Sequence, residues 1–371
     1  MVSFPLRFLW GFVVAVAFWP GISGAAFTPR WAAVAIGSAI LVRYDDVYLR
    51  RVPALLLLAW LSLAGLSIME TADPGSGVLD LYFLIVLAGA FLAGAQFDDL
   101  RHVLGGLSVG VGVSSALVIL QLAGYPLVAH TNGPPSGLFF NSEVLAELAA
   151  PLLVWMLVRR SPLSVFLIVP VLACQSRVAI AACAFGLLIA FPRKWLILAT
   201  GACLVIAITV FGAGRLTSGL FRAQGWAIAF DLITPFGHGL GTMRAMTPFG
   251  ELAHSDVLQA LVELGAVAVP FLLLAVVLLW RGSDDLAGRA AFGAICLEAV
   301  VSFPLHTPAG GFLAALLAGH LARVRPGLLW FGYDRGAAPG SGIWTSRNFI
   351  RDTRGPICRG SVPVRSPVSD V

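Results

Sequence analysis

The chain of 371 residues is 58% hydrophobic and only 12% charged, with a net charge of +5 and a mean hydropathy of +0.90. A water-soluble domain keeps about a quarter of its residues charged, so this composition excludes a soluble globular protein. The basic excess suits the anionic inner leaflet of a membrane, and we expect no nucleic-acid partner.

Apolar stretches follow one another along the chain, separated by short breaks that contain Arg, Gly or Pro. This pattern is typical of an all-α polytopic membrane protein. We predict about twelve transmembrane helices, within a range of ten to twelve, at residues 9–27, 31–42, 53–69, 78–97, 103–122, 143–158, 163–175, 178–191, 195–213, 255–280, 290–304 and 309–322. Several of these stretches are shorter than the roughly 20 residues that a spanning helix needs.

The two ends of the chain differ in composition. The first apolar stretch, 9–27, contains the bulky residues Trp10 and Trp19, and further spans follow directly, so we predict an uncleaved helix and not a signal peptide. Residues 323–371 are rich in Gly, Pro, Ser and Arg, which predicts a disordered basic tail. The expected organisation is a membrane domain over residues 1–322 followed by this tail.

Basic residues are distributed unevenly between the two sides of the predicted bundle. Of the 24 Lys and Arg residues, those in the outer breaks are Arg30, Arg177, Arg215, Arg222 and Arg244, and the others lie in the inner breaks and the tail. Because cytoplasmic loops carry the excess of Lys and Arg, we predict that both termini and the tail are cytoplasmic.

Four of the five outer arginines lie in or beside one long extracytoplasmic stretch, about residues 214–254. Arg177, Arg215, Arg222 and Arg244 therefore depart from the usual charge bias. Clustered guanidinium groups suit a bidentate partner such as phosphate. The alternative is that each of them pairs with a carboxylate or with a lipid headgroup.

A polar stripe precedes the apolar part of the predicted span 255–280. Asp256, Gln259 and Glu263 lie at positions i, i+3 and i+7, so they share one helix face and should point into the bundle. Acids inside a membrane indicate a functional site, although a hydrogen bond between helices is an alternative for Glu263 and for Glu298.

His254 stands at the beginning of the same segment, on the side of Leu258 and Leu261. The positive end of the helix dipole and nearby arginines should keep its imidazole neutral, and a neutral imidazole can act as a general base. The alternative is a structural histidine at the membrane interface.

Metal and nucleotide sites are not expected. The chain has no D-x-D motif, and its adjacent acid pairs fall in predicted inner loops, at Asp45/Asp46, Asp98/Asp99 and Asp284/Asp285. The five cysteines form no C-x-x-C pair. The glycines of "GHGLGTM" follow no strand of a βαβ unit, so we predict a tight turn that lets backbone approach a glycan or a diphosphate.

A family resemblance adds to this interpretation. "AHSDVLQALVELGAV" resembles the H-[NS]-x-x-L-x-x-x-x-E-x-G signature of the O-antigen ligase and polymerase superfamily, which includes exopolysaccharide polymerases. Four other stretches resemble family segments in the same order, and together they cover about residues 137–320: "GLFFNSEVLAELAAPLL", "QSRVAIAACAFGLLIAF", "FRAQGWAIAFDLITPFGHGLGTM" and "SFPLHTPAGGFLAALLAG". The chain departs from the family pattern at Val178, where Gly is usual, at Ser142 and Glu143, and in its short extracytoplasmic loop.

The resemblance implies a membrane glycosyltransferase of the GT-C type in a bacterial inner membrane, with its active site facing the periplasm. Such an enzyme transfers a glycan from undecaprenyl diphosphate to a sugar hydroxyl, with inversion and without metal or cofactor. His254 would be the base, and Arg177 and Arg222, followed by Arg215 and Arg244, would bind the diphosphate. The expected substrate contacts are Asn141, Asp256, Glu263 and His306.

Three functions remain open at this stage. Within the transferase, an O-antigen or exopolysaccharide polymerase and an O-antigen ligase acting on a lipid A core acceptor are both compatible with the motifs. A membrane transporter of lipid-linked glycan or another anionic solute is the alternative, and a non-catalytic partner of polysaccharide-assembly proteins is the third.

Overall fold

The computed structural model describes residues 4–18, 27–42, 49–125, 127, 134–139, 141–191, 216–246 and 254–323. The predicted span 195–213, Arg215 and the predicted tail beyond Arg323 lie outside the described residues.

The secondary structure of the described residues is helical. Their β pairing is limited to an isolated antiparallel bridge between Leu49 and Arg323. The helices are α1 (Phe4–Val16), α2 (Thr28–Leu41), α3 (Arg51–Ser67), η2 (Ile68–Glu70), α4 (Pro74–Gln96), α5 (Arg101–Leu122), α6 (Ser142–Val158), α7 (Ser164–Ala173), α8 (Arg177–Ala190), α10 (Leu216–Asp231), α11 (Thr242–Met246), α12 (Asp256–Leu264), α13 (Val269–Arg281), α14 (Leu286–Val301), η3 (Pro304–His306) and α15 (Pro308–Ala322). These bounds follow most of the predicted apolar spans closely, but the predicted span 9–27 is wrong, because α1 begins at Phe4 and ends at Val16.

Three of the described helical segments are long and apolar enough to cross a bilayer: α3 continued by η2, α4 and α5. The outward faces of these and other helices carry large apolar side chains in contact with the surroundings, such as Leu55, Leu58 and Leu66 on α3. A soluble protein rarely exposes apolar surface on this scale, and a lipid-facing helix requires it. The helices therefore indicate membrane embedding.

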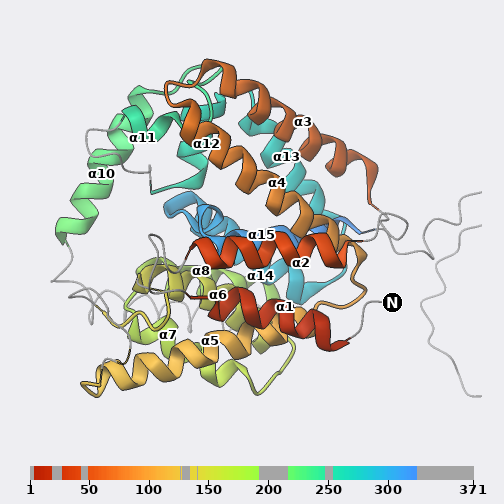
Figure 1. Cartoon of the computed structure of the whole chain (residues 1–371), viewed down its shortest axis with the longest axis vertical. Helices are drawn as coiled ribbons and strands as arrows, with labels where there is room; N and C mark the ends of the chain where they lie inside the picture. Colours follow the sequence, from red (N-terminus) through yellow and green to blue (C-terminus); the bar gives the residue numbers. More distant parts are fainter. Residues whose placement is uncertain are drawn as a thin grey trace, which may run out of the picture. The chain divides into compact units, whose positions relative to one another are not determined.

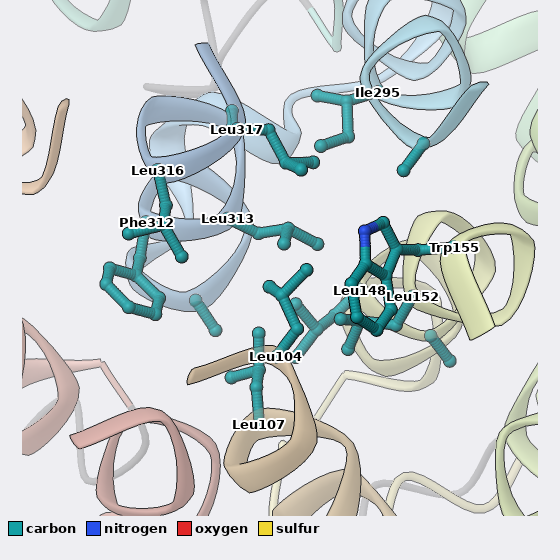
Figure 2. Packing of buried hydrophobic residues seen from close by; sticks show 14 of the residues in the cluster. Leu104, Leu107, Leu148, Leu152, Trp155, Ile295, Phe312, Leu313, Leu316 and Leu317 are labelled. Atoms are coloured by element: carbon teal, nitrogen blue, oxygen red, sulfur yellow. The ribbon is translucent and has the colours of Figure 1, made fainter. Parts of the chain in front are cut away.

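The largest cluster of buried apolar side chains lies where α5, α6, α14 and α15 meet. Figure 2 shows Leu104 and Leu107 of α5 together with Leu148 and Leu152 of α6 and Leu313 of α15, pointing toward a common interior. Nearly every residue of α6 between 144 and 156 is buried. Helix α6 is thus central, whereas α3 and α13, which run side by side, have mainly exposed apolar faces (Figure 1).

Glycines allow the most intimate helix contacts. At the crossing of α4 and α15, a Cβ on Gly94 would lie 2.1 Å from the carbonyl oxygen of Leu316, and one on Gly319 would lie 1.9 Å from that of Phe91. At the crossing of α1 and α5, a Cβ on Gly106 would lie 2.0 Å from the carbonyl oxygen of Phe8. Such backbone approach through small residues is the usual way in which membrane helices associate.

The predicted continuous span 255–280 is wrong, because α12 ends at Leu264 and α13 begins at Val269. Gly265 breaks the helix with a φ of 86°, in the left-handed region that favours glycine. The freed backbone is satisfied by the preceding loop: the Ala266 amide donates to the Thr234 carbonyl (3.0 Å) and the Val267 amide to the Pro235 carbonyl (3.1 Å). Interrupted helices at membrane depth need such internal partners.

Arg50 connects the beginning of α3 with the ends of two other helices. Its guanidinium donates to the carbonyls of Leu278 and Leu279 at the end of α13, both at 3.0 Å, and to that of Leu321 at the end of α15 at 2.5 Å. We call this arrangement the Arg50 clamp. It places a positive charge where two helix dipoles have their negative ends.

Candidate functional site around helix α12

Helix α12 is short and strongly defined at both ends. Ser255 caps its N-terminus, with the hydroxyl accepting a hydrogen bond from the Leu258 amide at 3.2 Å. Asp256, Gln259 and Glu263 are 6%, 1% and 2% exposed, so the predicted polar stripe does face the protein interior. A polar face buried among membrane helices must find its partners within the protein.

Asp256 finds its partners 50 residues further along the chain. One carboxylate oxygen contacts Nδ1 of His306 at 2.5 Å, and the other accepts the Leu305 amide at 2.9 Å. The Asp256 amide donates to the Ser302 carbonyl at 3.0 Å. These bonds tie the start of α12 to the turn between α14 and α15. The Asp256 side chain is 4% exposed and that of His306 is 25% exposed, so the pair reaches the surface only through the imidazole.

Two buried acids and a serine lie behind this pair. The Ser302 hydroxyl donates to Oε1 of Glu147, in the middle of α6, at 2.7 Å. Glu298, on α14, is fully buried, interacts electrostatically with Glu147 and Asp256, and has no hydrogen-bond partner for either carboxyl oxygen among the described residues. An acid without a hydrogen bond in this position costs stability.

At the other end of the stripe, Glu263 holds the glycine-rich turn 235–243. Its Oε1 accepts from the Gln259 side chain at 3.1 Å and from the Met243 amide at 3.2 Å. The amides of His238 and Gly239 donate to the carbonyls of Val262 and Glu263 at 3.0 and 2.9 Å. The predicted tight turn is confirmed by the positive φ angles of its three glycines, Gly237, Gly239 and Gly241.

The close approach of these glycines is to backbone of the protein itself. A Cβ on Gly237 would lie 2.3 Å from the Glu263 carbonyl oxygen, and one on Gly239 would lie 2.5 Å from the Thr71 amide. The turn is thus packed between α12 and the start of α4.

His254 lies outside α12, two residues before its first helical position, with a φ of 49°. Its predicted place on a helical wheel beside Leu258 and Leu261 is therefore wrong, because the chain turns at the Ser255 cap. The imidazole is half-buried and meets the ring of Phe303 edge to face, with centroids 5.1 Å apart. His254 thus packs against Phe303 of the short segment 302–307, and His306 belongs to the same segment.

The other predicted site residues are Asn141 and the four arginines. Asn141 caps α6, where its side-chain oxygen accepts the Glu143 amide at 2.8 Å, and it is otherwise exposed. Arg177 is the first residue of α8 and is exposed. Arg222 falls in α10 and Arg244 in α11, but their side chains, like the whole of Arg215, lie outside the described residues.

The side chains gathered here are named the α12 polar cluster, which consists of Asp80, Glu147, Asp256, Gln259, Glu263, Glu298, Ser302 and His306. Among the described residues no three His, Cys, Asp or Glu side chains converge as they do around a metal ion. The chemistry available to the cluster is proton transfer and hydrogen bonding.

The sequence interpretation missed two acids of the cluster. Glu147 and Asp80 were not selected, although each is an acid inside a predicted span, and an intramembrane acid is a functional signal in itself. That signal alone would have found them, but not their partners on other helices.

No protein-family model matches this chain, and no curated protein matches it either.

Proposed function

We propose that the protein is a periplasm-facing, metal-independent glycosyltransferase of a bacterial inner membrane. It would transfer a glycan from undecaprenyl diphosphate to a sugar hydroxyl with inversion, as an O-antigen or exopolysaccharide polymerase or as an O-antigen ligase. About twelve spanning helices in a GT-C type arrangement, with both termini cytoplasmic, complete the proposal.

The observation that carries this proposal is the convergence of separate family-like stretches. Residues 235–243, 254–264 and 302–309 meet through hydrogen bonds of Glu263 and Asp256, and residues 137–153 join them through Glu147 and Ser302. The resemblance rests on motif residues and on the order of the stretches along the chain. Contact in space between stretches up to about 150 residues apart is therefore independent support. A chance set of motifs gives no reason for such contact.

The polarity of the site supports the same chemistry. Under the proposed topology α6, α8, α12 and α15 all begin on the periplasmic side, which places Asn141, Arg177, His254 and His306 at one face. His254 would remove the acceptor proton, and Arg177 and Arg222, with Arg215 and Arg244, would hold the diphosphate as its bond to sugar C1 breaks. No metal is required for this charge balance.

One observation favours a second candidate, a transporter of lipid-linked glycan or another anionic solute. The break between α12 and α13, beside buried acids, is a feature that transporters use for solute sites at the bilayer midplane. Under this alternative, loss of the protein would leave lipid-linked glycan on the cytoplasmic side.

The test is the surface glycan of a strain lacking the protein, complemented with wild type, His254→Ala or His102→Ala. His102 lies at the start of α5, on the proposed cytoplasmic side, so it serves as the matched histidine control. We expect His254→Ala to abolish glycan transfer at unchanged protein level, because a positioned base contributes about 10²- to 10⁴-fold in rate.

The form of the defect separates the subclasses. Loss of long lipid A-linked chains with accumulation of lipid-linked polymer indicates a ligase, and products limited to single repeat units indicate a polymerase. Normal glycan in the uncomplemented strain, or full rescue by His254→Ala, would contradict the transferase with His254 as its base.

A further inference from the structure

The Asp256–His306 pair leaves one nitrogen of the imidazole directed away from its partner. Nδ1 faces the Asp256 carboxylate at 2.5 Å, and Nε2 has no hydrogen bond to any described residue. The His306 side chain is 25% exposed, whereas that of Asp256 is 4% exposed. A ligand reaching this face therefore meets Nε2 of a ring whose orientation is already set by the Leu305 and Asp256 bonds.

Among the described residues, the titratable groups that interact with His306 are acids. Asp256 and Glu263 of α12 and Asp80 of α4 interact electrostatically with the imidazole, and Glu147 of α6 and Glu298 of α14 lie behind Asp256. Carboxylates close to an imidazole favour its charged form. The surroundings of His306 thus favour an imidazolium that donates through both nitrogens.

His254 has the opposite setting. It precedes the N-terminus of α12, where the positive end of the helix dipole disfavours a second positive charge, and its ring packs against Phe303. Two titratable groups of one type whose environments favour opposite protonation states are the arrangement expected of a base and an acid that act in one reaction.

We propose that His306 is a diphosphate-binding general acid and that Asp256, which contacts its Nδ1, is its positioning residue. This inference rests on the proposed function. It adds to the arginines a cation located on the turn between α14 and α15, which meets the leaving group through Nε2–H.

The proposed step balances as follows. The acceptor hydroxyl gives its proton to His254 while its oxygen forms a bond to sugar C1. The bond between C1 and the diphosphate oxygen breaks, and its electron pair stays on that oxygen, which takes the Nε2 proton of His306. His254 then releases a proton to water, and His306 takes one up.

The direct test is calorimetric titration of the purified full-length protein in detergent with inorganic pyrophosphate. The variants are His306→Gln, which keeps a neutral donor toward Asp256, Asp256→Asn, and His102→Gln as the matched control. We expect about tenfold weaker pyrophosphate binding for His306→Gln and for Asp256→Asn, and unchanged binding for His102→Gln. Lowering the pH from about 8 to about 6 should tighten binding by Asp256→Asn more than by wild type, because its imidazole charges at lower pH.

Equal pyrophosphate affinity for wild type and His306→Gln overturns the proposal, as does undetectable binding by wild type. A merely structural role of His306 is contradicted when His306→Gln unfolds at the wild-type temperature yet binds more weakly. His254→Ala should bind pyrophosphate normally while losing glycan transfer. Failure of the proposed function is therefore seen in the glycan of the deletion strain, and failure of this inference is seen in the titration.

Discussion

The Arg50 clamp and the α12 polar cluster are two ways of placing polar groups among apolar helices. The guanidinium of Arg50 is held by three carbonyls at helix C-termini, which are fixed partners of opposite polarity. In the α12 polar cluster, by contrast, Asp256, Glu263 and Asp80 interact with the His306 imidazole. Glu147 and Glu298 lie behind Asp256, and Glu298 has two oxygens without hydrogen bonds among the described residues.

Polar groups with complete hydrogen bonding stabilise the fold, whereas buried polar groups without it lower stability. Arg50 supplies donors to carbonyls in the last turns of two helices, where partners within the helix are lacking or few, so the clamp should stabilise the fold. A buried acid such as Glu298, whose carboxyl oxygens have no hydrogen bond to any described residue, has the opposite effect, and we expect a membrane protein to retain it where function needs it. We therefore expect Arg50 to serve stability and the α12 polar cluster to serve the proposed chemistry.

Removing the clamp should have the largest effect on stability. Arg50→Ala removes the side-chain donor from the carbonyls of Leu278, Leu279 and Leu321, of which that of Leu278 keeps the Gly282 amide. We expect a loss of about 3 kcal/mol in the free energy of unfolding. Thermal unfolding in detergent measures it, with the exposed neighbour Arg51→Ala as the control. Glycan transfer per folded molecule should not change, and a selective loss of transfer would contradict the division of roles.

Replacing Glu298 tests the other side of the comparison. Glu298→Leu removes a buried carboxyl that lacks hydrogen bonds, so we expect a gain of about 1 to 2 kcal/mol in stability together with reduced glycan transfer. Glu147→Leu is the matched variant, and it should lose stability because the Ser302 hydroxyl then loses its acceptor. Destabilisation by both substitutions would show that Glu298 is a structural group.

The smallest effect concerns Asp285, the N-cap residue of α14 in the loop after α13. Burial raises the pKa of Asp285, but the hydrogen bond from His320 and the charge of Arg159, whose Nη2 lies 3.0 Å away, outweigh burial and hold the pKa below its ordinary value. A carboxyl with a lowered pKa in the folded state stabilises above its unfolded pKa of about 3.9 and loses this contribution as the pH falls through the folded value.

Asp285→Asn should therefore lower both the unfolding temperature and the free energy of unfolding at neutral pH. We expect the loss of free energy to be at most about 1 kcal/mol, because Arg159 is partly exposed and solvent screens its charge. The difference from wild type should begin to shrink below about pH 4 and should vanish once the pH is below the lowered folded pKa. Unfolding curves recorded against pH measure it, with Asp284→Asn as the control. A difference that persists in acid would mean that the amide disturbs the cap itself.

Much of the helical framework could be predicted from the sequence, because a membrane helix can be recognised from the composition of its own residues. Bilayer thickness and the need to satisfy every backbone group within the helix make long apolar runs such as 103–122 unambiguous. The buried stripe of Asp256, Gln259 and Glu263 was predictable for a similar reason, since helical periodicity alone decides which residues share a face. The break after Leu264 was not, because Gly265 becomes a helix end only when Thr234 and Pro235 supply partners for the turn.

The sequence by itself determined the helical class of the described residues, most of their apolar spans, the buried face of α12 and the segments that meet at the candidate site. Only the tertiary structure decided that Asp256 pairs with His306 and not with its neighbour His254, and that Glu147 and Glu298 lie behind that pair. The physical reason is range. Periodicity and capping act within a few residues, whereas a buried charge is satisfied by whatever group the packing of distant helices brings within hydrogen-bonding distance.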